Sequence, residues 1–262
     1  MFEITRYESE RRVRGTVVLV VLLALYVALV LAIAPDLIAQ YAELAGSLPE
    51  TFQKLFGVSG MSTLAGFLSV EFYQFGWLVV LGLFFAYSAG SLVAHDVETD
   101  HMDTLLSAPI SRSKIVVEKF LSLLMPILAV NIAVGIVVYA GTTLIAVDES
   151  LTLADIVAVH ALSIPYLLCC AGIGLCLSVL VSREHTAQRA ALGVVFGLYM
   201  LESLVIDTDY EWLGALSPTR YYEPTTILVE NTYDLAGAVI LLAAAIVLVA
   251  ASQFWFRRTD IQ

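Results

Sequence analysis

The first long apolar stretch of the chain lies at residues 15–35 and reads GTVVLVVLLALYVALVLAIAP. No charged residue interrupts it. A helix rises about 1.5 Å per residue, so about 20 apolar residues cross the roughly 30 Å of hydrocarbon in a bilayer. Lipid offers no partner for backbone N–H and C=O groups, which favours a helix over an open strand. Residues 15–35 therefore predict a membrane-spanning helix.

Composition extends this interpretation to the whole chain of 262 residues. The chain is 60% hydrophobic and 14% charged, with a mean hydropathy of +0.88, whereas soluble domains average about 45–50% apolar and about 25% charged residues. These values exclude a soluble enzyme, a disordered tail and a secreted disulfide scaffold. We expect an all-α polytopic membrane protein that forms one transmembrane domain over residues 1–262. Six windows nearly free of charge mark its spans, at about residues 16–35, 72–94, 120–146, 156–182, 190–206 and 235–256.

Basic residues set the expected orientation of these spans. If the N-terminus is cytoplasmic, 11 of the 13 Lys and Arg residues fall in cytoplasmic segments. They are Arg6, Arg11, Arg12, Arg14, Arg112, Lys114, Lys119, Arg183, Arg189, Arg257 and Arg258. This bias follows the positive-inside rule and predicts that both termini are cytoplasmic. The basic start and Ala32-Ile33-Ala34 also imitate a signal peptide, but the apolar run is about twice the usual 7–15 residues, so we expect an uncleaved first helix.

The net charge of −11 argues against a nucleic-acid partner, whose binding surface would be basic. An acidic chain with a sequence pI near 4.7 suits a high-salt habitat, where ions screen self-repulsion, and ordinary solvation of external loops accounts for the same charge. The three cysteines, Cys169, Cys170 and Cys176, lie in one predicted span and indicate small buried hydrophobes rather than disulfides or a metal site. His95 and His101 are six residues apart, which matches no compact ligand motif, so no metal site is predicted.

The loop between the second and third predicted spans, residues 95–119, is the most informative segment outside the spans. Acidic residues cluster at its start and basic residues at its end. Because negative charge stabilises a helix N-terminus, we expect a short helix from about Glu98 to Ser107. Pro109 is expected to end this helix and Ser111 to cap the next one. The apolar face of the short helix would hold Met102, Leu105 and Leu106.

The run from Glu98 to Lys119, with TLLSAPISR at residues 104–112 at its centre, resembles the signature loop of type-2 ABC exporter permeases. That family typically shows an acidic residue, Gly-Thr, two leucines, a proline, Ser-Arg and a downstream lysine. Here His101-Met102 stands in place of Gly-Thr. The resemblance covers the whole chain: it includes the charged N-terminal stretch, six spans, Ser217-Pro218 in the last external loop and the ending FRRTDI at residues 256–261.

The resemblance implies the permease subunit of an ATP-driven exporter in the plasma membrane. In that family the loop is a coupling helix that docks on a separate ATPase subunit, which binds ATP and Mg²⁺. A second permease copy or a paralogue completes the transporter. The chain has no Gly-rich phosphate loop that ends in Gly-Lys-Ser/Thr, so we expect no cofactor and no enzymatic activity on it. The residues that the resemblance assigns to ATPase contacts are Asp96, Glu98, Asp103, Leu105, Leu106 and Arg112.

The N-terminal residues 2–14 combine four arginines with apolar side chains. They predict an amphipathic helix on the inner leaflet, attracted by anionic lipid. In the family, such a helix also braces the ATPase subunit. A basic tail that only sets the topology explains the same residues.

Four polar residues are candidates for a transport pathway or gate. Glu202 lies near the outer end of the fifth span, and a membrane-embedded acid costs about 2.5–3.5 kcal/mol at mid-bilayer. It therefore lines a pathway or pairs with Arg220. The resemblance implies an external gate lined by Arg220 and Tyr222, and a packed aromatic belt is the alternative. Asn131 is the fourth candidate, and it, like His160, fits an interhelical hydrogen bond equally well.

Two other functions remain open on the sequence alone. An ion-coupled secondary transporter would use Glu202 and would need no ATPase. An intramembrane hydrolase would need a nucleophile with a base or a pair of acids, and the sequence contains neither a Gly-x-Ser-x-Gly elbow nor paired membrane glutamates.

Overall fold

The computed structural model describes residues 3–47, 58–107, 110–145 and 151–258, and within these ranges it contains helices and no strand. The N-terminal half comprises α1 (Glu3–Ser47), α3 (Val58–Met61), α4 (Leu64–Leu68), the π-helix η1 (Ser69–Leu81), α5 (Gly82–Gly90), α6 (Ala94–Glu98), α7 (His101–Ser107) and α8 (Arg112–Leu121). The rest comprises α9 (Leu124–Leu144), α10 (Leu153–Leu180), α11 (Glu184–Val205), the 3-10 helices η2 (Glu211–Leu216) and η3 (Pro218–Tyr221), α12 (Pro224–Val229) and α13 (Leu235–Arg258).

Six helical segments in these ranges are long and apolar enough to cross a membrane, which confirms the predicted fold class. They are Glu3–Ser47, Leu64–Glu98, Arg112–Leu144, Leu153–Leu180, Glu184–Val205 and Leu235–Arg258. Each overlaps one predicted window. The helices extend past the windows at most ends, because a charged residue ends an apolar window but does not end a helix.

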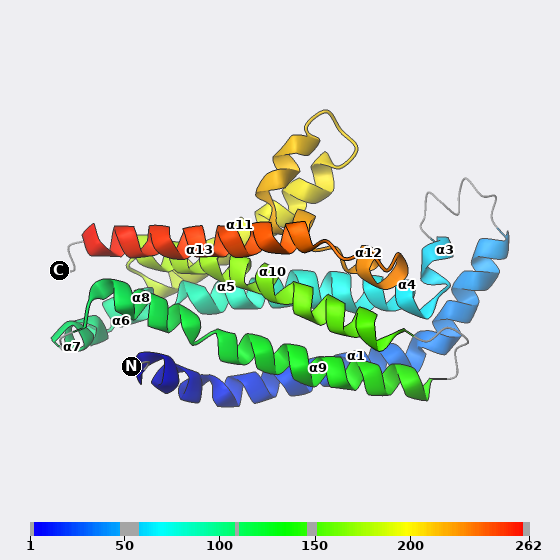
Figure 1. Ribbon diagram of the computed structural model, residues 1–262, viewed down its shortest axis with the longest axis horizontal. Helices are drawn as coiled ribbons and strands as arrows, with labels where there is room; N and C mark the ends of the chain where they lie inside the picture. Colours follow the sequence, from blue (N-terminus) through cyan, green and yellow to red (C-terminus); the bar gives the residue numbers. More distant parts are fainter. Residues whose placement is uncertain (1–2, 48–57, 108–109, 146–150, 259–262) are drawn as a thin grey trace.

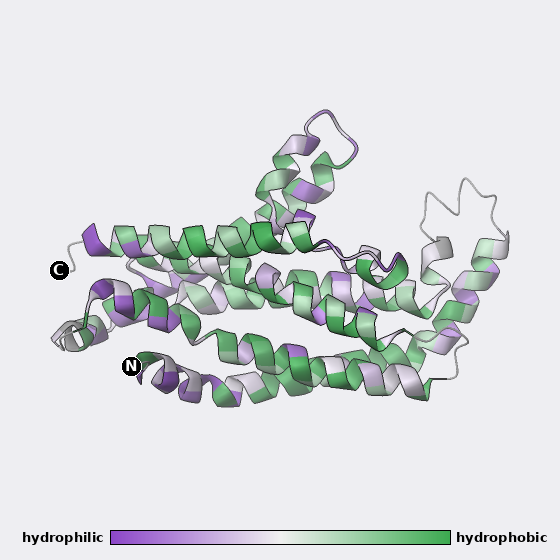
Figure 2. Ribbon diagram, viewed as in Figure 1, coloured by the Kyte–Doolittle hydropathy of each residue, from purple (hydrophilic) through white to green (hydrophobic). Residues whose placement is uncertain are grey.

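Both termini lie at one end of the bundle, together with α6, α7 and α8, and we call this the terminal end (Figure 1). The opposite end, which we call the far end, holds α3, α4 and α12 (Figure 1). Figure 2 shows hydrophilic residues gathered mainly at the ends and apolar residues between them, as expected for a bundle that crosses a bilayer.

Helix α10 lies at the centre of the bundle and packs against α5, α9, α11 and α13. Two glycines allow these close approaches. A Cβ on Gly174 would overlap the backbone oxygen of Ala86 in α5, and a Cβ on Gly172 would press on Leu248 of α13. In contrast, the C-terminal half of α11 projects sideways from the other helices together with η2 (Figure 1). Only a minor part of α11 is therefore buried within this chain.

The structure departs from six plain spans in three places. The third span breaks between α8 and α9 at Ser122–Leu123, where the ring of Pro126 would clash with the carbonyl four residues earlier. The second span is a π-helix over Ser69–Leu81, a rare form that hydropathy does not predict. The N-terminal segment, expected as an amphipathic helix, is helical but runs on into the first span as one helix, Glu3–Ser47.

Candidate functional site

The short helix predicted from about Glu98 to Ser107 is present as α7, which begins three residues later, and a separate short helix, α6, precedes it. Helix α6 ends at Glu98, and α7 begins at His101. Asp100, between them, has a φ of 59°, in the left-handed region that aspartate tolerates better than most residues. The turn therefore redirects the chain within two residues, and it places the start of α7 beside α6.

The next helix begins as the sequence predicts. The Ser111 hydroxyl accepts a hydrogen bond from the backbone N–H of Lys114 at 3.3 Å and caps α8. Pro109, which was expected to end the preceding helix, lies outside the described residues.

A buried lysine ties this segment to the first helix. Lys119 of α8 is 2% exposed, and its Nζ lies 2.6 Å from Asp96 Oδ2 and 3.1 Å from Glu8 Oε1. Asp96 belongs to α6 and Glu8 to α1, so one ammonium group joins three helices. Glu8 also pairs with Arg12, at 3.7 Å, so each buried carboxylate has a cation beside it. Such compensation matters because a lone buried charge is costly. We call Lys119, Asp96 and Glu8 the Lys119 cluster.

The neighbouring residue, Glu118, completes the start of α1. Its Oε2 accepts hydrogen bonds from the backbone N–H groups of Ile4, at 3.0 Å, and Thr5, at 3.4 Å. The Thr5 hydroxyl donates to the Glu118 carbonyl oxygen at 3.0 Å. The first backbone N–H groups of a helix have no partner within it, and a carboxylate there also interacts favourably with the helix dipole. Helix α8 therefore supplies the N-terminal cap that α1 lacks in its own sequence.

The predicted ATPase contacts occupy different environments. Asp96 is buried in the Lys119 cluster, whereas Glu98 is exposed and accepts a hydrogen bond from the backbone N–H of Glu184 at 2.7 Å. Leu105 is partly buried against the core. Arg112 donates to the carbonyl oxygen of Phe256 at 3.3 Å, and its guanidinium lies 5.8 Å from the centre of the Phe256 ring. The side chains of Asp103 and Leu106 lie outside the described part. Contact with a second subunit stays a prediction for all six residues.

Asn131 belongs to a buried polar cluster between α9, α10 and η1. Its Oδ1 accepts a hydrogen bond from the Ser163 hydroxyl at 2.7 Å and lies 3.3 Å from His160 Nδ1. His160 Nε2 lies 3.1 Å from the Tyr73 hydroxyl. The interhelical hydrogen bond expected for Asn131 and His160 is present. Both residues also border a cavity of about 340 Å³ between α9 and α10, whose other walls are mostly apolar.

The remaining gate candidates separate into an ion-pair group and a buried tyrosine. Glu202 Oε1 lies 3.7 Å from a guanidinium nitrogen of Arg220, which also pairs with Glu211 at 2.7 Å. The hydrogen bond to Glu211 raises the pKa of Arg220, so this side chain stays charged. Of the two explanations for Glu202, the pair with Arg220 is present. Tyr222 is 2% exposed, and its hydroxyl donates to the Val159 carbonyl oxygen at 3.0 Å.

Comparison with known families shows which family the chain belongs to. The sequence matches the family model described as ABC-2 family transporter protein over residues 3–261, which is nearly the whole chain. The chain belongs to the ABC-2 transporter family. It is thus a multi-pass membrane protein and a membrane subunit of an ABC transporter, and membership of this family implies an ATPase partner. No curated protein sequence matches the chain.

Sequence analysis of this ABC-2 permease missed the residues that join its helices at the terminal end. Glu8 and Glu118 were not singled out, and Lys119 counted only as a positive charge inside and as part of the family loop. A charged residue at the edge of an apolar window is the one signal that marks Glu118 and Lys119. That signal does not identify their partners: Ile4 and Glu8 lie more than 100 residues earlier in the chain, and Asp96 lies in a separate helix, α6.

Proposed function

We propose that this chain is the permease of an exporter in the plasma membrane, with both termini in the cytoplasm, and that its transport cycle is driven by ATP hydrolysis on a separate subunit. Residues 96–112, which include the end of α6 and all of α7, would receive the movement of that subunit. ATP and Mg²⁺ would bind to the partner. A second permease copy or a paralogue would complete the membrane part.

The Lys119 cluster is the observation that supports this proposal most. A displacement of α6 by a docked ATPase would act on Asp96, which pairs with Lys119 at 2.6 Å. Lys119 lies in the helix that leads into the third span, and it also pairs with Glu8 of the first helix. Buried ion pairs strongly resist the loss of a partner, so the three helices would move together. A force on one short surface segment would in this way reach two spans.

The exposed contacts of the same segment are consistent with docking. Glu98 lies on the surface beside the start of α11, and Leu105 of α7 is only partly covered by this chain. We propose that Glu98, Asp103 and Arg112 make polar contacts with the ATPase and that Leu105 and Leu106 anchor it. Asp96 would contribute by positioning α6.

The substrate pathway is proposed to involve the candidate gate residues. Asn131 borders the cavity between α9 and α10, which suits an apolar or amphipathic molecule with a hydrogen-bonding group. Arg220 and Tyr222 would lie near the external opening. The pairing of Glu202 with Arg220 accounts for this acid without ion coupling, so nothing observed favours a secondary transporter.

The partner can be tested by photo-crosslinking from α7 in the native membrane. Ser107, an exposed residue of α7, would be replaced by benzoylphenylalanine. We expect an adduct with a protein that contains a phosphate-loop ATPase domain, identified by mass spectrometry. The yield of this adduct should change when the ATPase is trapped with ATP and vanadate. The matched control places the same group at Thr232, an exposed residue between α12 and α13. It should yield no such adduct.

Orientation needs a separate test. Ser107→Cys and Thr232→Cys each add one exposed thiol, whereas the natural cysteines lie in α10 and are mostly buried. A membrane-impermeant maleimide should label Thr232→Cys in intact cells and Ser107→Cys only in inverted vesicles. The opposite pattern, or no ATPase adduct from α7 in native membranes, would overturn the proposal.

A further inference from the structure

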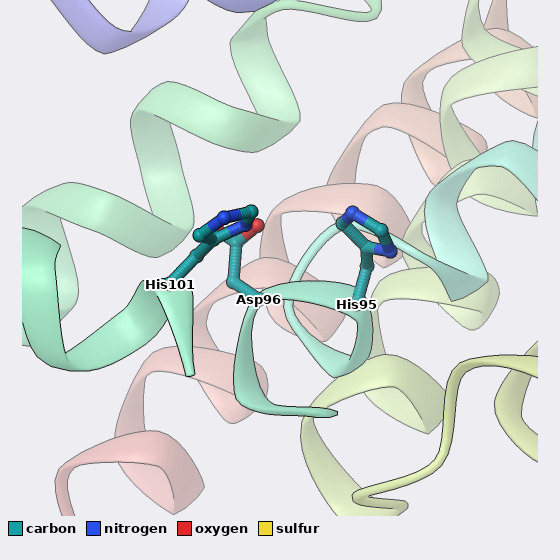
Figure 3. Close-up of side chains that lie close together, drawn as sticks. All are labelled: His95, Asp96 and His101. Carbon is teal, nitrogen blue, oxygen red and sulfur yellow. The ribbon is translucent and has the colours of Figure 1, made fainter. Parts of the chain in front are cut away.

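Three potential metal ligands meet at the turn between α6 and α7. They are His95 and Asp96 of α6 and His101, the first residue of α7 (Figure 3). One ligand atom from each lies within 4.8 Å of the others, and the two imidazole ring centres are 6.3 Å apart. The reversal at Asp100 brings them together although six residues separate the histidines. We propose that these three side chains bind a divalent transition-metal ion of the Zn²⁺ type.

The hydrogen bond that His95 makes through Nδ1 leaves Nε2 available to bind a metal. Its Nδ1 lies 2.7 Å from Glu184 Oε2, and an ionised carboxylate can only accept, so Nδ1 carries the proton in the neutral ring. Nε2 then keeps its lone pair. A histidine that donates one ring N–H to a carboxylate and binds the metal through the other nitrogen is the usual arrangement in metal sites.

The same argument applies independently to His101. Its Nδ1 lies 3.1 Å from the hydroxyl of Thr99, and that hydroxyl donates its hydrogen to the His95 carbonyl oxygen at 2.7 Å. The Thr99 oxygen must therefore accept from His101, which puts the proton on Nδ1 and leaves Nε2 with a lone pair. Both rings are thus held in the tautomer that binds a metal through Nε2. The exposed ring of His101 also gives an ion access from solvent.

Asp96 can supply the third ligand while it stays in the Lys119 cluster. Lys119 Nζ pairs with Oδ2, and a carboxylate can accept on both oxygens, so Oδ1 can serve the metal. Opposite charges balance around the same hollow, because it is lined by three acidic and three basic residues: Glu8, Asp96 and Glu184, and Arg11, Arg12 and Lys119. A bound cation would therefore meet no uncompensated positive charge.

The ligand types select the metal. Two imidazoles and one carboxylate suit Zn²⁺, Co²⁺ or Ni²⁺, whereas Mg²⁺ and Ca²⁺ prefer oxygen ligands alone. Three protein ligands leave a fourth position for water. Such an ion would join α6 to α7 across the turn at Thr99–Asp100. It would fix the angle of α7 relative to the bundle.

The experiment measures metal binding to the detergent-purified permease, isolated through an affinity tag that contains no histidine. After equilibrium dialysis against micromolar Zn²⁺, we expect about one ion per chain. Co²⁺ substitution should give visible absorption bands of a low-coordinate site. His95→Gln and His101→Gln should each lower the affinity at least 100-fold. Thr99→Val, which removes the group that orients His101, should lower it about 10- to 100-fold.

The matched control is His185→Gln, which changes an exposed histidine of α11 outside the cluster and should leave binding unchanged. His101 is itself exposed, so its substitution leaves the fold intact and keeps the test valid if His95→Gln fails to fold. Binding that survives both His95→Gln and His101→Gln overturns the proposal, as does the absence of binding at micromolar Zn²⁺. No ATPase takes part, so the outcome is independent of the proposed transport function.

Discussion

The two ends of this bundle are held together by different chemistry. At the terminal end, the Lys119 cluster joins three helices through full charges that are almost completely buried. Towards the far end, neutral tyrosine hydroxyls donate to backbone carbonyl oxygens of neighbouring helices, as Tyr222 does to Val159 at 3.0 Å and Tyr166 does to Leu78 at 2.7 Å. The rings of Tyr166 and Tyr222 also stack on one another, 5.5 Å apart.

This difference predicts where the fold is most sensitive. Removal of one member of a buried charge cluster leaves another charge without a partner, which costs about 3–5 kcal/mol. Removal of a tyrosine hydroxyl loses one neutral hydrogen bond, which contributes about 1 kcal/mol. The terminal end should therefore tolerate single substitutions less well than the far end, although the terminal end is the more polar of the two. Thermal unfolding in detergent, followed by a thiol-reactive dye on the buried cysteines Cys169 and Cys170, can measure each case.

The largest effect is expected for Lys119→Met, which leaves the buried Asp96 without its cation and Glu8 with only the longer pair to Arg12, at 3.7 Å. We expect a loss of about 3–5 kcal/mol in the free energy of unfolding. Arg6→Met is the matched control, because the side chains of Arg6 and Glu10 are 82% and 64% exposed, and the loss of such a surface pair should leave stability nearly unchanged. If Lys119→Met also carries Glu8→Gln and Asp96→Asn, much of the stability should return. An equal loss in the single and triple variants would contradict the charge argument.

Gly174→Ala tests whether close packing of the central helix, rather than polar contacts, holds the middle of the bundle. The added Cβ would overlap the backbone oxygen of Ala86, so α5 and α10 must separate, at a cost of about 1–3 kcal/mol. Gly193→Ala in α11 meets no atom within 4 Å. It should be neutral or stabilising by up to about 1 kcal/mol, because alanine stabilises the helical conformation more than glycine does. Similar unfolding temperatures for the two variants would refute this contrast.

Tyr222→Phe measures one tyrosine contact alone. The ring and its stacking on Tyr166 remain, while the hydrogen bond to Val159 is lost, so we expect a loss of about 1 kcal/mol. Tyr210→Phe, at an exposed position, should change stability by less than about 0.5 kcal/mol. A loss as large as that of Lys119→Met would show that the far end is no more tolerant than the terminal end.

Apart from the control variants, Arg220→Gln should give the smallest shift in unfolding temperature. Its pair with Glu211 lies at the surface, where water and salt screen it, and its pair with Glu202, whose side chain is 16% exposed, is long at 3.7 Å. The shift should shrink further in high salt. A large shift that salt does not change would mean that Glu202 depends on this arginine as a buried partner.

The two ends also differ in how far the sequence predicts them. Charge-free windows predict the six spans, because the cost of unpaired backbone and charge in lipid acts on each segment separately. The Ser111 cap follows from local spacing, and one of the two roles expected for Glu202, its pair with Arg220, is present. The contact between Glu118 and Ile4 joins residues 114 apart, and the break between α6 and α7 lies at Asp100, a non-glycine residue with a positive φ. Neither has a periodic signal, so the details of the candidate coupling segment required the structure.

The contact of Glu118 with the start of α1 also has a consequence for biosynthesis. The chain emerges from the ribosome N-terminus first, so α1 is made long before residue 118 exists. Until α8 is synthesised, the amides of Ile4 and Thr5 lack the carboxylate that later receives them. The first turn of α1 is thus completed only after the first two membrane-spanning segments have been translated, and its amides stay available to water, lipid headgroups or chaperones during that interval.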